Sequence, residues 1–138
     1  MSKSVSVSLR KRVKYRAEAR YEYCLLPERV SYYSFHVEHI RSIKNGGTDQ
    51  FDNLAYCCPD CNYFKGSNVA TFAEDDETLV RFFDPRKDLW EDHFHLKNGV
   101  ITGKTAIGTA TEQIFRFNEV DRLIFRQQLI GLNLYPFS

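Results

Sequence analysis

Between Phe35 and Gly66 the chain holds the kinds of side chain that hydrolysis of a phosphodiester bond requires. Glu38 and His39 are adjacent, and Asn62 follows inside the segment C-x-x-C-N-x-x-K. Near pH 7 a neutral imidazole accepts a proton from water, and carboxylate and amide oxygens are ligands that Mg²⁺ or Mn²⁺ prefers. The segment is therefore a candidate site for activating water beside one divalent cation.

The order and spacing of these residues resemble the HNH endonuclease family, whose core is a ββα-metal hairpin followed by a helix. The resemblance implies that His39 is the general base and that Glu38 and Asn62 hold one catalytic cation, Mg²⁺ or Mn²⁺. Asn53 matches a family position that implies a scaffold, which hydrogen-bonds the long loop and fixes the histidine. Flanking segments (RYEYCLLPE before, FDPRKDLWEDHF and TAIGTAT after) resemble the lead-in and C-terminal extension of a compact bacterial HNH group.

Each of these residues also has a plainer interpretation. His39 alone is compatible with a strand end whose ring bonds a backbone carbonyl, and Asn62 with an amide on a helix surface. Glu38 is equally compatible with a surface pair to Arg41. Neighbours on a regular strand face opposite sides, so Glu38 and His39 share a site only if the strand ends or bulges there.

Three further residues are candidates for contact with substrate. Lys65 lies on the helical face of the amide ligand, where it would reach a phosphate, although a plain surface lysine is nearly as reasonable. Arg41 is a second candidate for contact with nucleic acid. His36 falls on the strand face of Glu38, where it contacts substrate or metal, or packs as an ordinary strand histidine.

The cysteines depart from the family pattern. Many HNH proteins bind a structural zinc ion through two C-x-x-C pairs, but Tyr21 stands where the first of these cysteines would be. Three thiols remain, one short of a closed tetrahedral site: Cys24, Cys58 and Cys61. We therefore expect no structural zinc, with Tyr21 and the thiols packed as core. The alternative is a fourth ligand from His93 or His95.

Charge is distributed unevenly along the chain. The formal net charge is only +1, yet residues 1–20 carry seven Lys or Arg against one acid. Such a local basic patch fits contact with phosphate on double-stranded DNA, and the alternative is a solvated basic helix that binds nothing. The candidate contacts are Arg10, Lys11, Arg12 and Lys14.

Composition bounds the class of protein. With 138 residues, the chain has room for one hydrophobic core. No apolar run approaches the roughly 20 residues of a membrane span, and the first residues lack the apolar run of a secretory signal. Together with the C-x-x-C spacing, these features favour the cytoplasm. Nothing in the sequence indicates an oligomeric state.

The patterns predict an α+β fold in one domain over residues 1–138. We expect a basic helix over about 8–20, capped by Ser8, and a ββα-metal core over about 21–68. In that core a strand over Tyr32–Ile40 is followed by a turn at Asn45–Gly47, a second strand through Leu54, and a helix from Pro59 to Gly66.

A C-terminal extension is expected over about 79–134. Its hairpin turns at Lys97–Gly99, and helices follow over Thr105–Phe117 and after Asn118 or Asp121. Trp90 and Phe94 are expected to anchor it on the core.

These patterns favour a metal-dependent endonuclease that hydrolyses phosphodiester bonds of DNA, with weak or structure-based specificity because no base-reading element is recognisable. One alternative is a catalytically inactive, HNH-like module that binds nucleic acid without metal. Another is a redox or zinc-binding protein built around Cys58 and Cys61, which leaves the acidic residue, the histidine and both asparagines unexplained.

Overall fold

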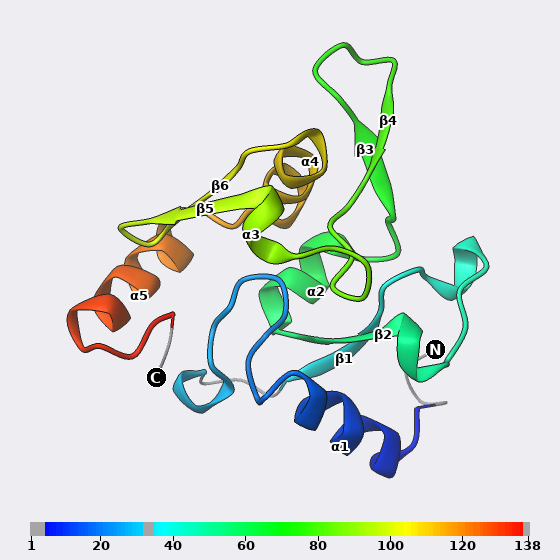
Figure 1. Cartoon of the computed structure of the whole chain (residues 1–138), viewed down its shortest axis with the longest axis horizontal. Coiled ribbons are helices and arrows are strands. Elements are labelled where there is room, and N and C mark those ends of the chain that lie inside the picture. Colours follow the sequence, from blue (N-terminus) through cyan, green and yellow to red (C-terminus); the bar gives the residue numbers. More distant parts are fainter. Residues whose placement is uncertain (1–4, 32–34, 137–138) are drawn as a thin grey trace.

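The computed structural model describes residues 5–31 and 35–136, which form a mixed α/β structure. Within these residues each sheet is an antiparallel hairpin of two strands. The pairs are β1 (His36–His39) with β2 (Leu54–Cys57), β3 (Ala70–Phe72) with β4 (Leu79–Arg81), and β5 (Phe94–Lys97) with β6 (Val100–Gly103). Figure 1 shows the first hairpin between α1 and α2, with the other two hairpins beyond α2.

The helices connect and cover these hairpins. The α-helices are α1 (Val7–Arg16), α2 (Pro59–Lys65), α3 (Trp90–His93), α4 (Ala106–Phe115) and α5 (Val120–Gly131). Short 3₁₀ helices occupy Glu28–Val30, Ile43–Asn45 and Phe51–Asn53. Among the helices of the described part of the chain, none has both the length and the apolar character of a membrane span.

Helix α1 begins and ends earlier than the sequence pattern predicts. Its N-cap is Ser6 rather than Ser8, because the Ser6 hydroxyl accepts the Leu9 N–H at 3.2 Å. It ends at Arg16 because residues 18 and 19 both adopt a positive φ of 56°. Val13 is fully buried toward β2, which leaves most of the basic side chains on the outer face.

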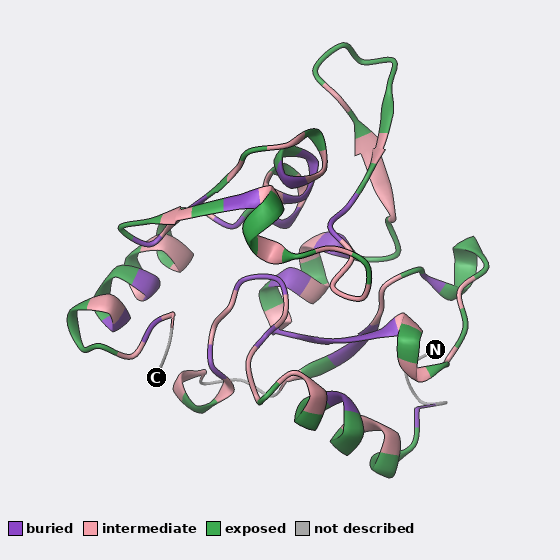
Figure 2. Cartoon of the chain, viewed as in Figure 1, coloured by how far each residue is buried: buried purple, intermediate pink, exposed green. Residues whose placement is uncertain are grey.

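The first hairpin and α2 form the centre of the fold. His36 lies opposite Cys57 and His39 opposite Leu54, so β1 ends at the histidine. β2 is buried along its whole length, as the continuous purple of Figure 2 shows. The expected order of strand, loop, strand and helix is present, although β1 is shorter than predicted and residues 32–34 lie outside the described residues.

The extension packs on this centre through aromatic rings. Phe115 of α4 is fully buried, with its ring centroid 4.9 Å from that of Tyr23. The Trp90 indole N–H donates to the Tyr23 carbonyl at 2.9 Å, and the rings of Trp90 and Phe94 lie 4.9 Å apart. The predicted hairpin at Lys97–Gly99 is present as β5 and β6.

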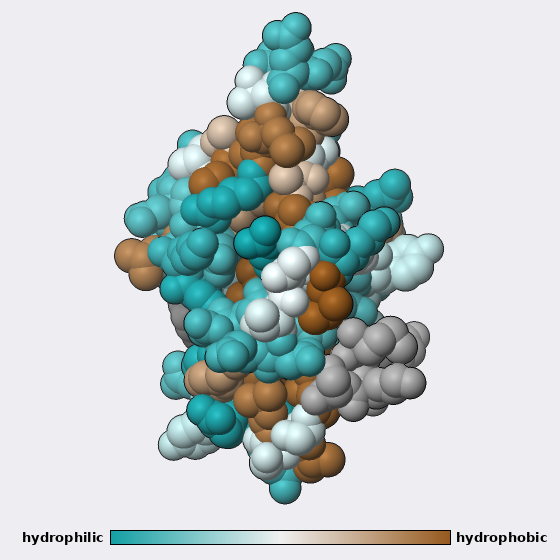
Figure 3. Space-filling model, turned by 90° about the vertical axis from the view of Figure 1, so that its right-hand side faces the viewer, coloured by the Kyte–Doolittle hydropathy of each residue, from teal (hydrophilic) through white to brown (hydrophobic). Residues whose placement is uncertain are grey.

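The β3–β4 hairpin projects from the rest of the molecule at the top of Figure 1. Figure 3 shows a hydrophilic tip with hydrophobic surface gathered beneath it. Phe72 and Leu79 are paired in register across the two strands and are 57% and 63% exposed.

Replacing Phe115 by alanine tests whether the extension shares one core with the segment that precedes β1. We expect the free energy of unfolding to fall by about 3–5 kcal/mol, because the change loses apolar burial and leaves a cavity. Urea unfolding followed by Trp90 fluorescence measures this difference. The control is Tyr63→Ala, which removes a ring that is 79% exposed and should change stability by less than about 0.5 kcal/mol. Equal stabilities of the two variants would contradict a shared core.

Candidate active site and metal centre

A cavity of about 300 Å³ lies between β1 and α2. Its lining includes His36, Glu38 and His39 from the strand and Asn62 from the helix. Neighbours on a regular strand face opposite sides, but β1 ends at His39. The side chain of His39 can therefore share a cavity with that of Glu38. The structure thus brings to one cavity four of the residues that the sequence pattern selects.

The imidazole of His39 is paired with a carboxylate. Its Nε2 lies 2.6 Å from Oδ1 of Asp49, a residue of the loop between β1 and β2. A carboxylate accepts the hydrogen bond, so Nε2 carries the proton and Nδ1 of the neutral ring is left as the acceptor. Sequence reasoning missed Asp49. The available signal was a short acidic side chain in the loop that returns to the second strand.

Asn53 organises the same loop. Its Oδ1 accepts the Arg41 N–H at 2.9 Å, and its Nδ2 donates to the carbonyls of Arg41 and Thr48 at 2.9 and 2.8 Å. Gly47 lies so close that a Cβ there would be 1.7 Å from the Arg41 carbonyl oxygen. These contacts are the ones a scaffold needs, and the catalytic importance of Asn53 stays a prediction.

Lys65 does not lie where the sequence pattern places it. The side chain is 1% exposed, and its ammonium donates to the His39 carbonyl at 3.0 Å and lies 3.4 Å from Glu38 Oε1. The prediction that Lys65 contacts a phosphate is therefore wrong. The reason is that its helical face is turned toward the hairpin, so the lysine joins α2 to the end of β1.

Glu38 is 5% exposed and faces this lysine. Burial raises the pKa of Glu38 to about 7, while Lys65 and the nearby Tyr23 hydroxyl act in the opposite direction. Its Oε2 has no hydrogen-bond partner among the described residues. Glu38 and Asn62 line the same cavity, and their carboxylate and amide groups are the kind of hard oxygen donor that fits a divalent cation.

The basic residues of α1 are partly engaged within the protein. Lys14 pairs with Glu28 at 3.1 Å, and the guanidinium of Arg12 lies 4.3 Å from the Phe51 ring centroid. Arg10 lies over the ring of Phe35 in the same way. Lys11 and Arg12 are exposed, as is Arg41, whose Nε donates to the Asn45 carbonyl at 2.7 Å. Their contact with nucleic acid stays a prediction.

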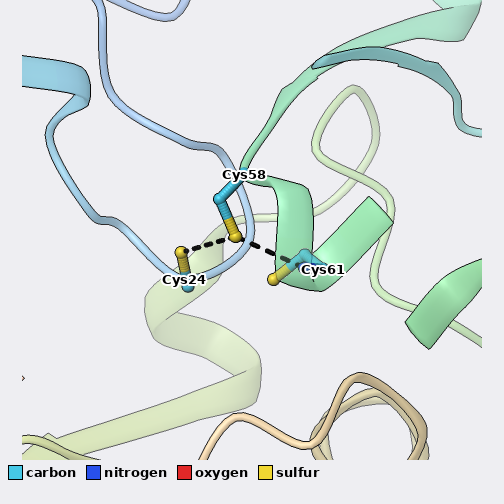
Figure 4. Close-up of side chains that lie close together, drawn as sticks. All are labelled: Cys24, Cys58 and Cys61. Carbon is cyan, nitrogen blue, oxygen red and sulfur yellow. Dashed lines mark hydrogen bonds between the residues drawn. The ribbon is translucent and has the colours of Figure 1, made fainter. Parts of the chain in front are cut away.

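Three buried thiols form a second cluster at the start of α2. Figure 4 shows Cys24 facing Cys58 and Cys61 at the start of α2. All three sulfurs lie within 4.8 Å of one another, and those of Cys24 and Cys58 are 3.7 Å apart. Two thiolates on a tetrahedral zinc, each about 2.3 Å from the metal, are separated by about 3.8 Å. The thiol geometry therefore fits a zinc-type ion.

This cluster corrects the expectation that structural zinc is absent and that Tyr21 takes its place. The ligand group is assembled and buried, and the Cys61 N–H donates to Cys58 Sγ at 3.3 Å. Tyr21 is fully buried but stacks on Tyr56, with ring centroids 5.3 Å apart. The alternative fourth ligands, His93 and His95, are not members of the group.

The guanidinium of Arg122 lies beside the thiols. Nη2 of Arg122, on α5, is 3.0 Å from Cys61 Sγ and 3.7 Å from Cys58 Sγ. Hydrogen bonding with the Cys58 and Cys61 thiols, together with Arg122, holds the pKa of the Cys24 thiol well below its ordinary value. In contrast, burial raises the pKa of the neighbouring Cys57 to about 12.

Residues 22–68 match the family model described as HNH endonuclease. This segment contains β1, β2, α2 and the loop with Asp49 and Asn53. This segment of the chain is therefore similar to HNH endonucleases, a family of nucleases. No curated protein and no solved structure matches the chain.

The raised pKa of Glu38 predicts how stability depends on pH. Between the unfolded value of 4.5 and the folded value of about 7, the unfolded chain releases a proton that the folded protein keeps. The free energy of unfolding of the parent therefore falls as pH rises through this range, whereas Glu38→Gln has no such proton to release. Across this pH range we expect the free energy of unfolding of Glu38→Gln to rise, relative to that of the parent, by up to about 3 kcal/mol.

Urea unfolding at a series of pH values, without added divalent cation, measures this difference. The control is Glu91→Gln, because Glu91 is exposed and should follow the parent curve. Parallel curves for the parent and Glu38→Gln would show that Glu38 keeps an ordinary pKa.

Proposed function

We propose that this chain is a metal-dependent endonuclease that hydrolyses phosphodiester bonds of double-stranded DNA. The observation that carries the proposal is the pair formed by His39 and Asp49 beside a cavity that Glu38 and Asn62 also line. The match of residues 22–68 to the HNH endonuclease family supports the class of reaction.

His39 acts as the general base in this proposal. Because Asp49 accepts the Nε2–H, the neutral ring presents Nδ1 to a water molecule. As Nδ1 takes one proton, the water oxygen attacks phosphorus and the bond to the 3′ oxygen breaks. The products are a 5′-phosphate and, once the leaving oxygen gains a proton, a 3′-hydroxyl. The Asp49 carboxylate stabilises the imidazolium that forms.

Glu38 and Asn62 are the proposed holders of the catalytic cation. When bound, a divalent cation supplies positive charge that offsets the charge developing on the phosphate oxygens. Lys65 keeps the Glu38 carboxylate and the His39 backbone in fixed positions, since its ammonium contacts both. His36 is exposed on β1 and lines the same cavity, where it faces substrate.

Double-stranded DNA is the proposed partner because basic residues collect on the exposed face of α1. Lys11, Arg12 and Lys14 are exposed there, and Arg41 is exposed on the loop that follows β1. Cations spaced along a helix and a nearby loop suit the phosphates of a duplex backbone, and they carry no sequence information of their own.

A plasmid-cleavage assay tests the proposal directly. Supercoiled DNA is incubated with the protein in Mg²⁺, in Mn²⁺ and in buffer without added divalent cation, and the nicked and linear products are quantified. Cleavage that requires an added cation supports the endonuclease. Duplex binding without cleavage under every condition would identify a catalytically inactive module instead.

The pairing of His39 with Asp49 predicts two graded losses of rate. His39→Ala should lower the cleavage rate about 10²–10⁴-fold while leaving duplex affinity nearly unchanged, because it removes the base but no phosphate contact. Asp49→Asn should lower the rate at least about tenfold by weakening control of the tautomer. Single-turnover cleavage and fluorescence-anisotropy binding measure the two quantities. Asp52→Asn, an exposed acid in the same loop, is the matched control and should cut at the parental rate.

Neutralising α1 should change the salt dependence of binding rather than the chemistry. If Arg10, Lys11, Arg12 and Lys14 all contact phosphates, their replacement by glutamine should reduce the slope of log K against log salt by about 3.6. Binding titrations at several salt concentrations give the slope. Replacing Lys97 and Lys104, which are exposed on the extension, provides the control. An unchanged slope in the α1 variant would show that this helix is a solvated surface that does not contact DNA.

A further inference from the structure

The thiol cluster has three protein ligands and no fourth. In the described residues no His, Cys, Asp or Glu other than Cys24, Cys58 and Cys61 belongs to the group. The remaining residues, 1–4, 32–34 and 137–138, contain none of these four residue types. A zinc ion here therefore lacks the fourth side chain that closes a structural site.

A cavity borders the cluster. It has a volume of about 210 Å³, and its lining includes Cys24 and Cys58 together with Arg122 and Phe125 of α5. A single water molecule occupies about 30 Å³ of liquid, so this space exceeds what one small ligand needs. Two of the three cysteines thus line a space that a small ligand can fill.

Charge at the site is balanced by Arg122. Three thiolates and one zinc ion carry a net charge of −1, and the guanidinium supplies +1 at 3.0 Å from Cys61 Sγ. Arg122 cannot itself ligate a metal, because a guanidinium has no free lone pair at ordinary pH. Its orientation is fixed from two further sides, by donation to the Phe115 carbonyl at 2.6 Å and by proximity to Asp60 at 3.7 Å.

We infer that Cys24, Cys58 and Cys61 hold one zinc-type ion whose fourth coordination position faces this cavity and takes an exchangeable ligand, water or a small anion, beside Arg122. The three thiols release their protons to solvent when the ion binds. This metal site is open, in contrast to a closed structural site, and it is separate from the cavity that His39 lines. It does not depend on the proposed nuclease chemistry.

Zinc content and X-ray absorption at the zinc edge test the coordination of the unmodified protein. We expect one zinc per chain, bound by three sulfurs and one lighter atom. Less than stoichiometric zinc, or a first shell of four sulfurs, would overturn the inference.

Cobalt substitution tests whether the fourth position is open. Co²⁺ in place of zinc should give the intense visible bands of a tetrahedral thiolate site, and titrated azide should shift those bands by replacing water. Bands that do not respond to azide would show that the position is closed. Tyr21→Cys restores the cysteine that the family pattern has at this position, and it should yield four sulfurs and bands that azide no longer moves.

Variants separate the ligands from the balancing charge. Cys58→Ser should abolish stoichiometric Co²⁺ binding, whereas Cys57→Ala, which alters the adjacent buried cysteine outside the group, should retain it. Arg122→Leu should weaken Co²⁺ binding about 10–100-fold, the range typical for a residue that supports metal ligands, and Arg122→Lys should recover part of that loss. Equal affinities for Arg122→Leu and the parent would remove the charge-balancing role.

Discussion

The contact that the candidate active site depends on is the buried ammonium of Lys65. A charge withdrawn from water costs several kcal/mol unless it is paired and hydrogen-bonded, and here Glu38 and the His39 carbonyl provide both compensations. Because these partners are consecutive residues at the end of β1, one side chain of α2 fixes where the strand stops. The acid, the histidine and the helix that carries Asn62 are therefore held in one arrangement.

The loop between β1 and β2 adds a second constraint of a different kind. Asn53 closes it with three hydrogen bonds to backbone groups, and Gly47 permits an approach to Arg41 that no side chain would allow. Once closed, the loop presents Asp49 to the imidazole. The orientation of His39 is thus set from one side by a buried charge and from the other by the path of the backbone.

Local chemistry with fixed spacing was predictable from the sequence, and partnerships between distant segments were not. Strand propensity before His39, the turn signal at Asn45–Gly47 and Pro59 at a helix start correctly indicated a strand, loop, strand and helix, because these signals act over a few residues. Helical periodicity placed Lys65 on a face but could not say whether that face meets solvent or protein. The expectation that structural zinc is absent, which came from counting three thiols, failed for a related reason. The group that completes the surroundings of Cys61 is Arg122, an arginine of another helix 61 residues away.

The projecting β3–β4 hairpin gives the molecule an electrical polarity. Four consecutive acids, residues 74–77, form its tip, while the cations of α1 lie at the opposite end in Figure 1. Hydrogen bonds from Thr78 and Glu77 lower the pKa of Asp75 to about 2, so this end keeps its negative charge in any ordinary buffer. Such a dipole turns the protein in the field of a polyanion before the two surfaces touch, over distances comparable to the Debye length of about 10 Å at 0.1 M salt. Although the net charge of the chain is only +1, one end of the molecule is attracted to a polyanion and the other end is repelled by it.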